Sequence, residues 1–406
     1  MKRTPFSRTE KRLLLGGALV VLLLGGLGFA LATRKNSGGI PPHAPLPNPN
    51  GFDLYVAAAN AMTRPHPPVD ENSDRKKRSP QEAAKLYTPA RRAAFVASNL
   101  KTWDLMQQAR AAQTQHPDIR ANWLAKLPYQ PLRDLARGKT VEAKHFKDLN
   151  RWDLALQSGL DTIEMGRDIE HGAPILGSLV GIAVEAVGGA SLEDLPPHLN
   201  AKDAKNGARR LEKIITAGTS PAEVLREEKW GALTAAQNNF GAQPNRWAGI
   251  LMSPMTASIG PMMDKNIAEI AKPYPLQTNP PAPTGFFNRY AAVMYLQPKR
   301  YGFNVARRET SESQLLLRLA LRAYRVENRA YPDTLAQLAP QYLGKIPRDA
   351  FGRGEPMRYR KNGDSYTIWS IGPDGKDDNG APIPIKPGKK RVVISATSRG
   401  DAVTRP

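Results

Sequence analysis

Glu164, Asp168 and His171 are the first residues of this 406-residue chain whose types and spacing could support chemistry. At positions i, i+4 and i+7, a helix would place two carboxylates and an imidazole on one face. That geometry suits a divalent metal ion or a hydrolytic site. The alternative is a solvated helix face whose charges are balanced by Arg167. The sequence leaves both interpretations open.

Glu185 is a second candidate, because it is the one charged residue in the apolar stretch LVGIAVEAVGG. An ionised carboxylate inside an apolar helix needs a partner. An arginine from a neighbouring helix, a position facing a groove, or a role as general base would each explain it.

Asp374, Asp377 and Asp378 form a third group, in the loop GPDGKDDNG. Calcium takes six to eight oxygen ligands at about 2.3–2.6 Å, and three carboxylates with nearby carbonyls could supply most of them. The same composition is ordinary for the turn that ends a hairpin, because Asp, Asn and Gly all favour turns. The loop is therefore a candidate calcium site with an ordinary turn as its alternative.

Several classes of enzyme find no support in the sequence. The chain has no cysteine, which excludes disulfides, thiolate catalysis and cysteine-based zinc sites. It has no H-E-x-x-H, G-x-S-x-G, S-x-x-K, Walker or G-x-G-x-x-G motif. We therefore expect a binding or scaffold protein rather than an enzyme. The alternative is an extracytoplasmic hydrolase that uses Glu164, Asp168, His171 or Glu185.

The elements that would position these residues begin with an apolar run, residues 13–32, which is long enough as a helix to cross a hydrocarbon core of ~30 Å. Five basic residues lie in the preceding segment, 1–12, and two follow the run closely, so the positive-inside rule keeps the N-terminus in the cytoplasm. We expect a single-pass anchor in a bacterial inner membrane, with everything after it extracytoplasmic. A cleaved signal peptide is the alternative, because Ala30-Leu31-Ala32 has the small-x-small form.

The charge of the chain is strongly positive, with 58 Lys and Arg against 37 Asp and Glu. Outside the membrane, the polyanions within reach are lipid headgroups and acidic envelope polymers rather than nucleic acid. We expect the membrane as a partner, with envelope proteins or acidic polymers as further candidates and no nucleic acid. The basic residues are mostly scattered, which favours a generally basic composition over a dedicated polyanion site.

A Pro/Gly-rich linker, residues 33–50, precedes a predicted α-helical domain, residues 51–300. Capping boxes at Ser79-Pro80-Gln81-Glu82 and Ser220-Pro221-Ala222-Glu223 mark two helix starts, and Thr88-Pro89 marks another. An amphipathic helix around residues 151–172 is followed by a small-residue apolar segment, residues 174–195. This pair is similar to the helical hairpins of tetratricopeptide-type arrays.

A small α+β module is predicted over residues 305–385, followed by a basic segment, residues 386–406. A helix from Thr310 to Glu327 would carry a basic stripe that we expect to be an interaction surface for an acidic partner: Arg318, Arg322, Arg325 and Arg329. Alternating residues predict antiparallel strands at 357–360 and 366–371, joined by a turn, with a third strand at 391–396. The fold class is therefore mainly α, with a small antiparallel sheet at the end.

The ordered elements of this module resemble the globular domain of the major pseudopilin of type II secretion systems. The matching residues are Tyr324-Arg325, Glu327-Asn328, Tyr331-Pro332, Tyr342-Leu343, Pro347, Asp349, Phe351-Gly352, Trp369-Ser370, Gly372 and Asp374-Gly375. The resemblance covers about residues 310–380 and implies calcium in the loop after the Trp-Ser strand, with Asp374 at the family's Asp-Gly position. The longer glycine-rich continuation of that family's loop is missing after Asp378.

The N-terminus departs from the pseudopilin pattern, because the apolar run starts LLLGGALVV without the family's Phe-Thr-x-x-Glu. We therefore do not expect the chain to enter a pilus-like filament. As a whole it resembles membrane-anchored bacterial envelope proteins without a known activity. A secretion or pilus accessory that contacts true pseudopilins is one form of the expected scaffold role.

Overall fold

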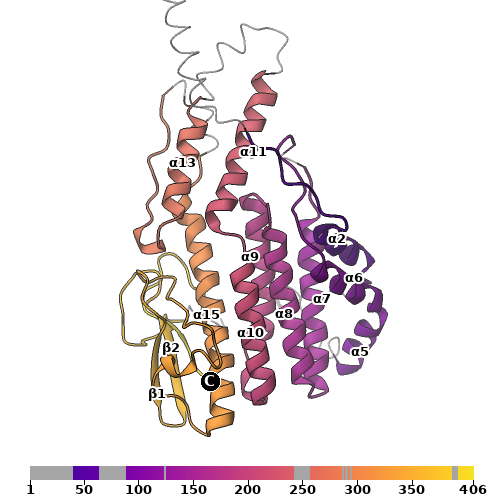
Figure 1. Cartoon of the computed structure of the whole chain (residues 1–406), viewed down its shortest axis with the longest axis vertical. Coiled ribbons are helices and arrows are strands. Elements are labelled where there is room, and N and C mark those ends of the chain that lie inside the picture. The colour runs from indigo at the N-terminus through magenta and orange to yellow at the C-terminus, as the bar shows by residue number, and fades with distance from the viewer. Residues whose placement is uncertain are drawn as a thin grey trace, which may run out of the picture.

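The computed structural model describes residues 40–63, 88–122, 125–241, 257–285, 288, 291–292, 295–385 and 392–406. In these ranges the protein is mainly helical, with one three-stranded antiparallel sheet, which confirms the predicted fold class at that level (Figure 1). The predicted anchor, residues 13–32, and the first capping box, residues 79–82, lie outside the described ranges. Within those ranges, no helix has the length and apolarity needed to span a membrane.

Helices make up most of the described chain. They are α2 (Gly51–Ala61), α5 (Pro89–Ser98), α6 (Leu100–Ala111), α7 (Tyr129–Asp148), α8 (Trp152–Glu170), α9 (Ile175–Ser191), α10 (Ala201–Ala217), α11 (Pro221–Gly241), α13 (Ile259–Ile270) and α15 (Pro298–Asn328). Short 3₁₀ turns are η1 (Pro196–His198), η2 (Tyr274–Leu276) and η4 (Leu335–Leu338). Two of the predicted helix starts are confirmed at Pro89 and Pro221, where proline occupies the first helical position, whose N–H would lack a partner in any case.

The hairpin of α8 and α9 lies at the centre of the molecule (Figure 1). The two helices can approach closely because glycines face each other at both ends of the crossing. A Cβ atom on Gly181 would lie 2.5 Å from the carbonyl oxygen of Gly166, and one on Gly188 would lie 2.8 Å from that of Gly159. The small-residue composition of α9 is therefore what brings the residues of the candidate site together.

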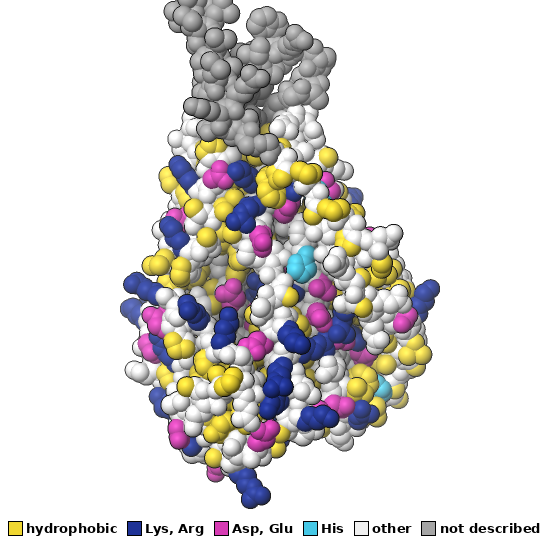
Figure 2. Space-filling model, in the orientation of Figure 1, with side chains coloured by type: hydrophobic (Ala, Val, Ile, Leu, Met, Phe, Trp, Pro, Cys, Tyr) yellow, Lys and Arg dark blue, Asp and Glu magenta, His cyan; other side chains and the backbone are white. Residues whose placement is uncertain are grey.

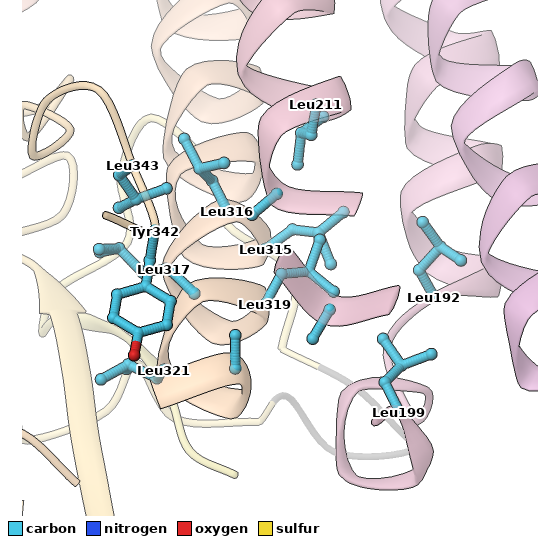
Figure 3. Close-up of a cluster of buried hydrophobic side chains, with 14 of the residues drawn as sticks. Leu192, Leu199, Leu211, Leu315, Leu316, Leu317, Leu319, Leu321, Tyr342 and Leu343 are labelled. Atoms are coloured by element: carbon cyan, nitrogen blue, oxygen red, sulfur yellow. The ribbon is translucent and has the colours of Figure 1, made fainter. Parts of the chain in front are cut away.

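The helix α15 connects the helical body with the C-terminal sheet. One hydrophobic core includes buried residues of α8, α10, α15 and the strands, and Figure 3 shows leucines of α15 between Leu211 of α10 and Tyr342 beyond η4. The boundary predicted near residues 300–305 falls inside α15, which begins at Pro298. The end of the chain is thus packed on the same helix as the helical body.

The sheet has the order β1-β2-β3, and all of its neighbours are antiparallel. Strands β1 (Arg358–Asn362) and β2 (Ser365–Ser370) confirm the predicted hairpin, and Gly363 in its turn has a positive φ of 60°. The predicted third strand at 391–396 is wrong. Residues 392–396 form no strand, and β3 is Ala402–Thr404 instead. Gln314 of α15 helps to fix β3, since its side-chain amide donates to the carbonyl of Ala402 at 2.6 Å.

Candidate functional site

A cluster of buried charges joins α8, α9 and α15. Arg167 donates to both carboxylate oxygens of Glu312 at 2.6 and 2.7 Å, and Arg308 donates to Glu170 at 2.6 Å. Glu185 lies between these two ion pairs, 3.3 Å from Nε of Arg167 and 3.6 Å from a terminal nitrogen of Arg308. All five side chains are at least nine-tenths buried. The cluster therefore holds three carboxylates against two guanidinium groups.

Glu185 differs from the other two carboxylates of the cluster, because neither of its oxygens accepts a hydrogen bond from any described residue. Its side chain is only 4% exposed. Burial raises the pKa of Glu185 well above its usual range, and Arg167 and Arg308 oppose that shift without cancelling it. Two of the alternatives that the sequence offered for Glu185, arginines of neighbouring helices and a position facing a groove, are found together.

A pocket of about 680 Å³ opens beside this carboxylate, and we name it the Glu185 pocket. Its walls come from α8, α9, α15, the segment 392–394 and the end of β3. Aliphatic side chains occur on every wall, together with Glu185, Arg308 and Glu312 of the buried cluster. The other polar residues of the lining are Glu193, Arg307, Ser311, Gln314, Arg318 and Thr404. A pocket of this size that combines aliphatic side chains with fixed polar groups is typical of small-molecule binding sites.

A second pocket, of about 850 Å³, is lined by Asp168 and His171, and we name it the Asp168 pocket. Tyr55 of α2 donates from its hydroxyl to Asp168 at 2.6 Å, and Thr219 lies 3.0 Å from Nδ1 of His171. Burial raises the pKa of Asp168 to about 7, although the bond from Tyr55 lowers it. Burial lowers the pKa of His171. Both groups are thus held in fixed positions at the edge of one cavity.

Glu164 does not join Asp168 and His171 in that pocket. It accepts a hydrogen bond from Arg110 of α6 at 2.7 Å and another from Arg210 of α10 at 2.7 Å. The three residues predicted to share a metal-binding face are therefore divided between an ion-pair network and a cavity. Groups of three or more His, Cys, Asp or Glu side chains suited to hold a metal are not found in the described ranges.

The acidic loop after β2 is organised by hydrogen bonds from its own chain. Asp377 accepts from the indole of Trp369 at 3.0 Å, from Nε of Arg358 at 2.7 Å and from the amide of Asn379 at 3.0 Å. These bonds make Asp377 a structural carboxylate of the turn.

The other two acidic residues of the loop are held more loosely. Among the described residues, Asp374 accepts two long bonds, of 3.4 Å, from the amides of Lys376 and Gly400. Asp378 donates its amide at 3.3 Å to Asp401, a buried carboxylate that also accepts from Gly380 at 2.6 Å. Calcium binding by this loop stays a prediction.

The arginines of the predicted basic stripe do not share one exposed surface. Arg318 is 9% exposed and donates from a terminal nitrogen to the carbonyl of Glu193. Arg322 donates from Nε to the carbonyl of Leu199 at 2.7 Å. Both side chains therefore bind backbone in the connection from α9 to α10.

The last two arginines of the stripe lie near the end of α15. Arg325 forms an ion pair with Asp364 at 2.9 Å, in the turn between β1 and β2. Arg329 is exposed and ends the helix in a left-handed conformation, with φ of 59°. Figure 2 shows Lys and Arg spread over the visible face, with acidic side chains between them.

Arg308 and Glu312 are two residues of the buried cluster that the sequence did not indicate. They lie in the basic, irregular-looking segment around the predicted start of the helix at Thr310, although α15 in fact begins at Pro298. A proline at the first helical position was the available signal. Extending the helix to Pro298 would have placed Arg308 and Glu312 one turn apart on one face.

No known protein family, curated protein or solved structure matches this chain.

Proposed function

We propose that this protein is a membrane-anchored extracytoplasmic binding protein of the bacterial envelope, and that the Glu185 pocket is its binding site. The observation that carries the proposal is the buried carboxylate of Glu185, which lines a pocket and accepts no hydrogen bond from the described residues. Leaving a buried polar group unpaired costs about 1–3 kcal/mol, and more for a charged group. A ligand that supplies the missing donor would recover that cost on binding.

The location in the proposal rests on the sequence of residues 13–32, which is apolar enough to cross a bilayer and is preceded by basic residues. An uncleaved anchor would hold the pocket outside the inner membrane. This part of the proposal is tested by protease treatment of spheroplasts, in which an extracytoplasmic body is digested while cytoplasmic proteins survive.

We further propose that the C-terminal unit, residues 305–385, is related to the pseudopilin globular domain. It would hold a structural calcium ion in the loop of Asp374. Its support is the order of the helix, the 3₁₀ turn and the antiparallel hairpin, with Asp349 and Trp369 at the matching places. The segment that follows this unit forms one wall of the pocket, through residues 392–394 and the end of β3. The hairpin of α8 and α9 would likewise belong with tetratricopeptide-type hairpins.

The binding role is tested with a neutral probe, 3-phenylpropan-1-ol, titrated by calorimetry into the full chain in lipid nanodiscs, with empty nanodiscs as the blank. Gly189 lines the Glu185 pocket, and a Cβ placed there meets no atom within 4 Å. The Cβ of Gly189→Phe therefore has room, and we expect the ring to fill the pocket and abolish binding. Gly231 of α11 is equally open and lies outside the lining of this pocket, so Gly231→Phe is the matched control and should bind normally.

Hydrolysis in the Asp168 pocket is the second candidate function. It is favoured by the pKa of Asp168 of about 7, which lets this carboxyl exchange a proton near neutral pH, and by His171 on the same cavity. Its test is the release of p-nitrophenol from p-nitrophenyl acetate and p-nitrophenyl phosphate. Activity that is lost in Asp168→Asn and kept in Glu185→Gln would favour the hydrolase over the binding protein.

A further inference from the structure

The buried cluster at the Glu185 pocket carries one more acidic group than basic groups. Glu170, Glu185 and Glu312 face Arg167 and Arg308. The excess of negative charge stays the same when two less buried neighbours on α15 are included. Arg307 adds a positive charge and Glu309 adds a negative one. A buried excess charge is costly unless a proton or another cation balances it.

The excess negative charge of the cluster is concentrated at Glu185. Glu170 and Glu312 each accept short hydrogen bonds from an arginine, whereas both oxygens of Glu185 accept none from the described residues. Arg308 donates to Glu170 from a terminal nitrogen, while its Nε and that of Arg167 have no hydrogen-bond partner among the described residues. The arginine at the far end of the pocket, Arg318, already donates to a backbone carbonyl and is ten residues along α15, or about 15 Å, from Arg308.

Aliphatic side chains line a large part of the space next to Glu185, and Arg307 and Glu193 are further charged residues in the lining. Ile182 of α9, Leu315 of α15 and Ile394 line the pocket, together with the half-exposed Val392 and Val393. A group that enters here must therefore combine a cationic hydrogen-bond donor with a hydrocarbon body. A primary ammonium group fits the donor, because it is compact and offers three N–H bonds to a carboxylate.

We propose that the Glu185 pocket binds an apolar molecule bearing a primary ammonium group, with the ammonium on the carboxylate of Glu185 and the hydrocarbon against the aliphatic walls. This inference rests on the proposed binding role and adds the class of ligand to it. The bound ammonium would take the place of the proton that otherwise balances the excess negative charge of the cluster, and it would give the oxygens of Glu185 their missing donors.

The test compares three probes of one shape, 3-phenylpropylamine, 3-phenylpropan-1-ol and 3-phenylpropanoate. Each is titrated by calorimetry at pH 7.5 into the full chain in nanodiscs. The amine is expected to bind about tenfold to a hundredfold tighter than the alcohol, as for a hydrogen bond to a charged group, and the acid weakest. Glu185→Gln should bring the amine to the affinity of the alcohol, and Gly189→Phe should abolish binding of both. Circular dichroism confirms that each variant is folded.

The possible outcomes distinguish the ligand class from the binding role. If alcohol and amine bind equally to the wild-type chain and both are lost in Gly189→Phe, the pocket binds ligands but the ammonium assignment is wrong. The ammonium assignment is also wrong if the amine keeps its advantage in Glu185→Gln, or if the acid binds tightest. If no probe binds, or if Gly189→Phe binds as the wild type does, the binding role itself fails together with the assignment.

Discussion

Two buried carboxylates of this protein, Asp349 in the C-terminal unit and Glu185 in the helical body, have opposite surroundings. Asp349 accepts from the hydroxyl of Ser370 at 2.5 Å, from the amides of Phe351 and Ile371 at 3.0 and 2.9 Å, and from Arg358 at 2.9 Å. Glu185 accepts no bond from the described residues. Both are almost fully buried, at 2% and 4% exposed.

The difference shows how a structural carboxylate can be told from one left open for a ligand. Asp349 connects the turn after η4 to the end of β2, so its carboxylate stabilises the fold. Glu185 holds no backbone group and faces a pocket. Burial alone therefore does not identify a functional acid, and the number of donors around it does.

The largest effect is expected for Asp349→Asn. The amide keeps one acceptor oxygen, but an NH₂ group replaces the other. At least two of the hydrogen bonds to Asp349 are therefore lost, and the NH₂ group points at another hydrogen-bond donor. We expect the free energy of unfolding to fall by roughly 2–4 kcal/mol, measured by urea denaturation. A loss below about 1 kcal/mol would mean that Asp349 does not hold the fold in this way.

The matched change in the helical body, Glu185→Gln, should cost far less. It removes the excess negative charge of the cluster and breaks no hydrogen bond, so the free energy of unfolding should change by less than about 1 kcal/mol in either direction. The same urea titration measures it. A loss of unfolding free energy as large as that of Asp349→Asn would show that Glu185 stabilises the fold as Asp349 does, and would contradict the difference drawn between the two carboxylates.

The pH dependence of stability tests a third carboxylate, Asp168, which faces Tyr55, Glu164 and Arg110. Its pKa is about 7 in the folded protein and about 3.9 in an unfolded chain. Between these values the folded state binds the extra proton, so this group makes stability fall as pH rises from about 4 to about 7. Asp168→Asn should remove that part of the slope in urea titrations across this window. An unchanged slope would show that Asp168 titrates normally.

The smallest effect is expected at the acidic loop. With the described residues Asp374 makes two long bonds, so Asp374→Ala should lower the free energy of unfolding by less than about 0.5 kcal/mol without calcium. If the loop binds calcium, millimolar calcium should raise the melting temperature of the wild-type chain and not of Asp374→Ala. An equal response of both proteins to calcium and to EDTA would rule out a calcium ion held by Asp374.

Local signals in the sequence predicted two helix starts and the hairpin well. Thr88-Pro89 and Ser220-Pro221 begin helices because proline needs no N–H partner there, and Ser220 and Glu223 form the expected capping bonds. Alternation and Gly363 located β1 and β2 within about one or two residues. The third strand was misplaced because β3 has only three residues, and long-range contacts with β2 and Gln314 select it rather than a local pattern.

The site was predictable only in part. The sequence required a partner for Glu185, because a charge in an apolar helix cannot stand alone. It could not name Arg167 and Arg308, which reach Glu185 from two other helices, one of them far along the chain. The prediction of an exposed basic stripe was wrong because a local pattern does not show what packs against a helix face. Periodicity showed that Arg318 and Arg322 share a helix face, but not that the connection from α9 to α10 covers it.

An experimental structure of the full chain with 3-phenylpropylamine would decide whether Glu185 is a ligand-binding carboxylate. We predict the amine nitrogen about 2.7–2.9 Å from a carboxylate oxygen of Glu185, with the phenyl ring against Ile182, Leu315 or Ile394. An amine bound elsewhere, or a Glu185 carboxylate whose hydrogen bonds come from ordered water or from protein groups while the pocket stays empty, would contradict this assignment.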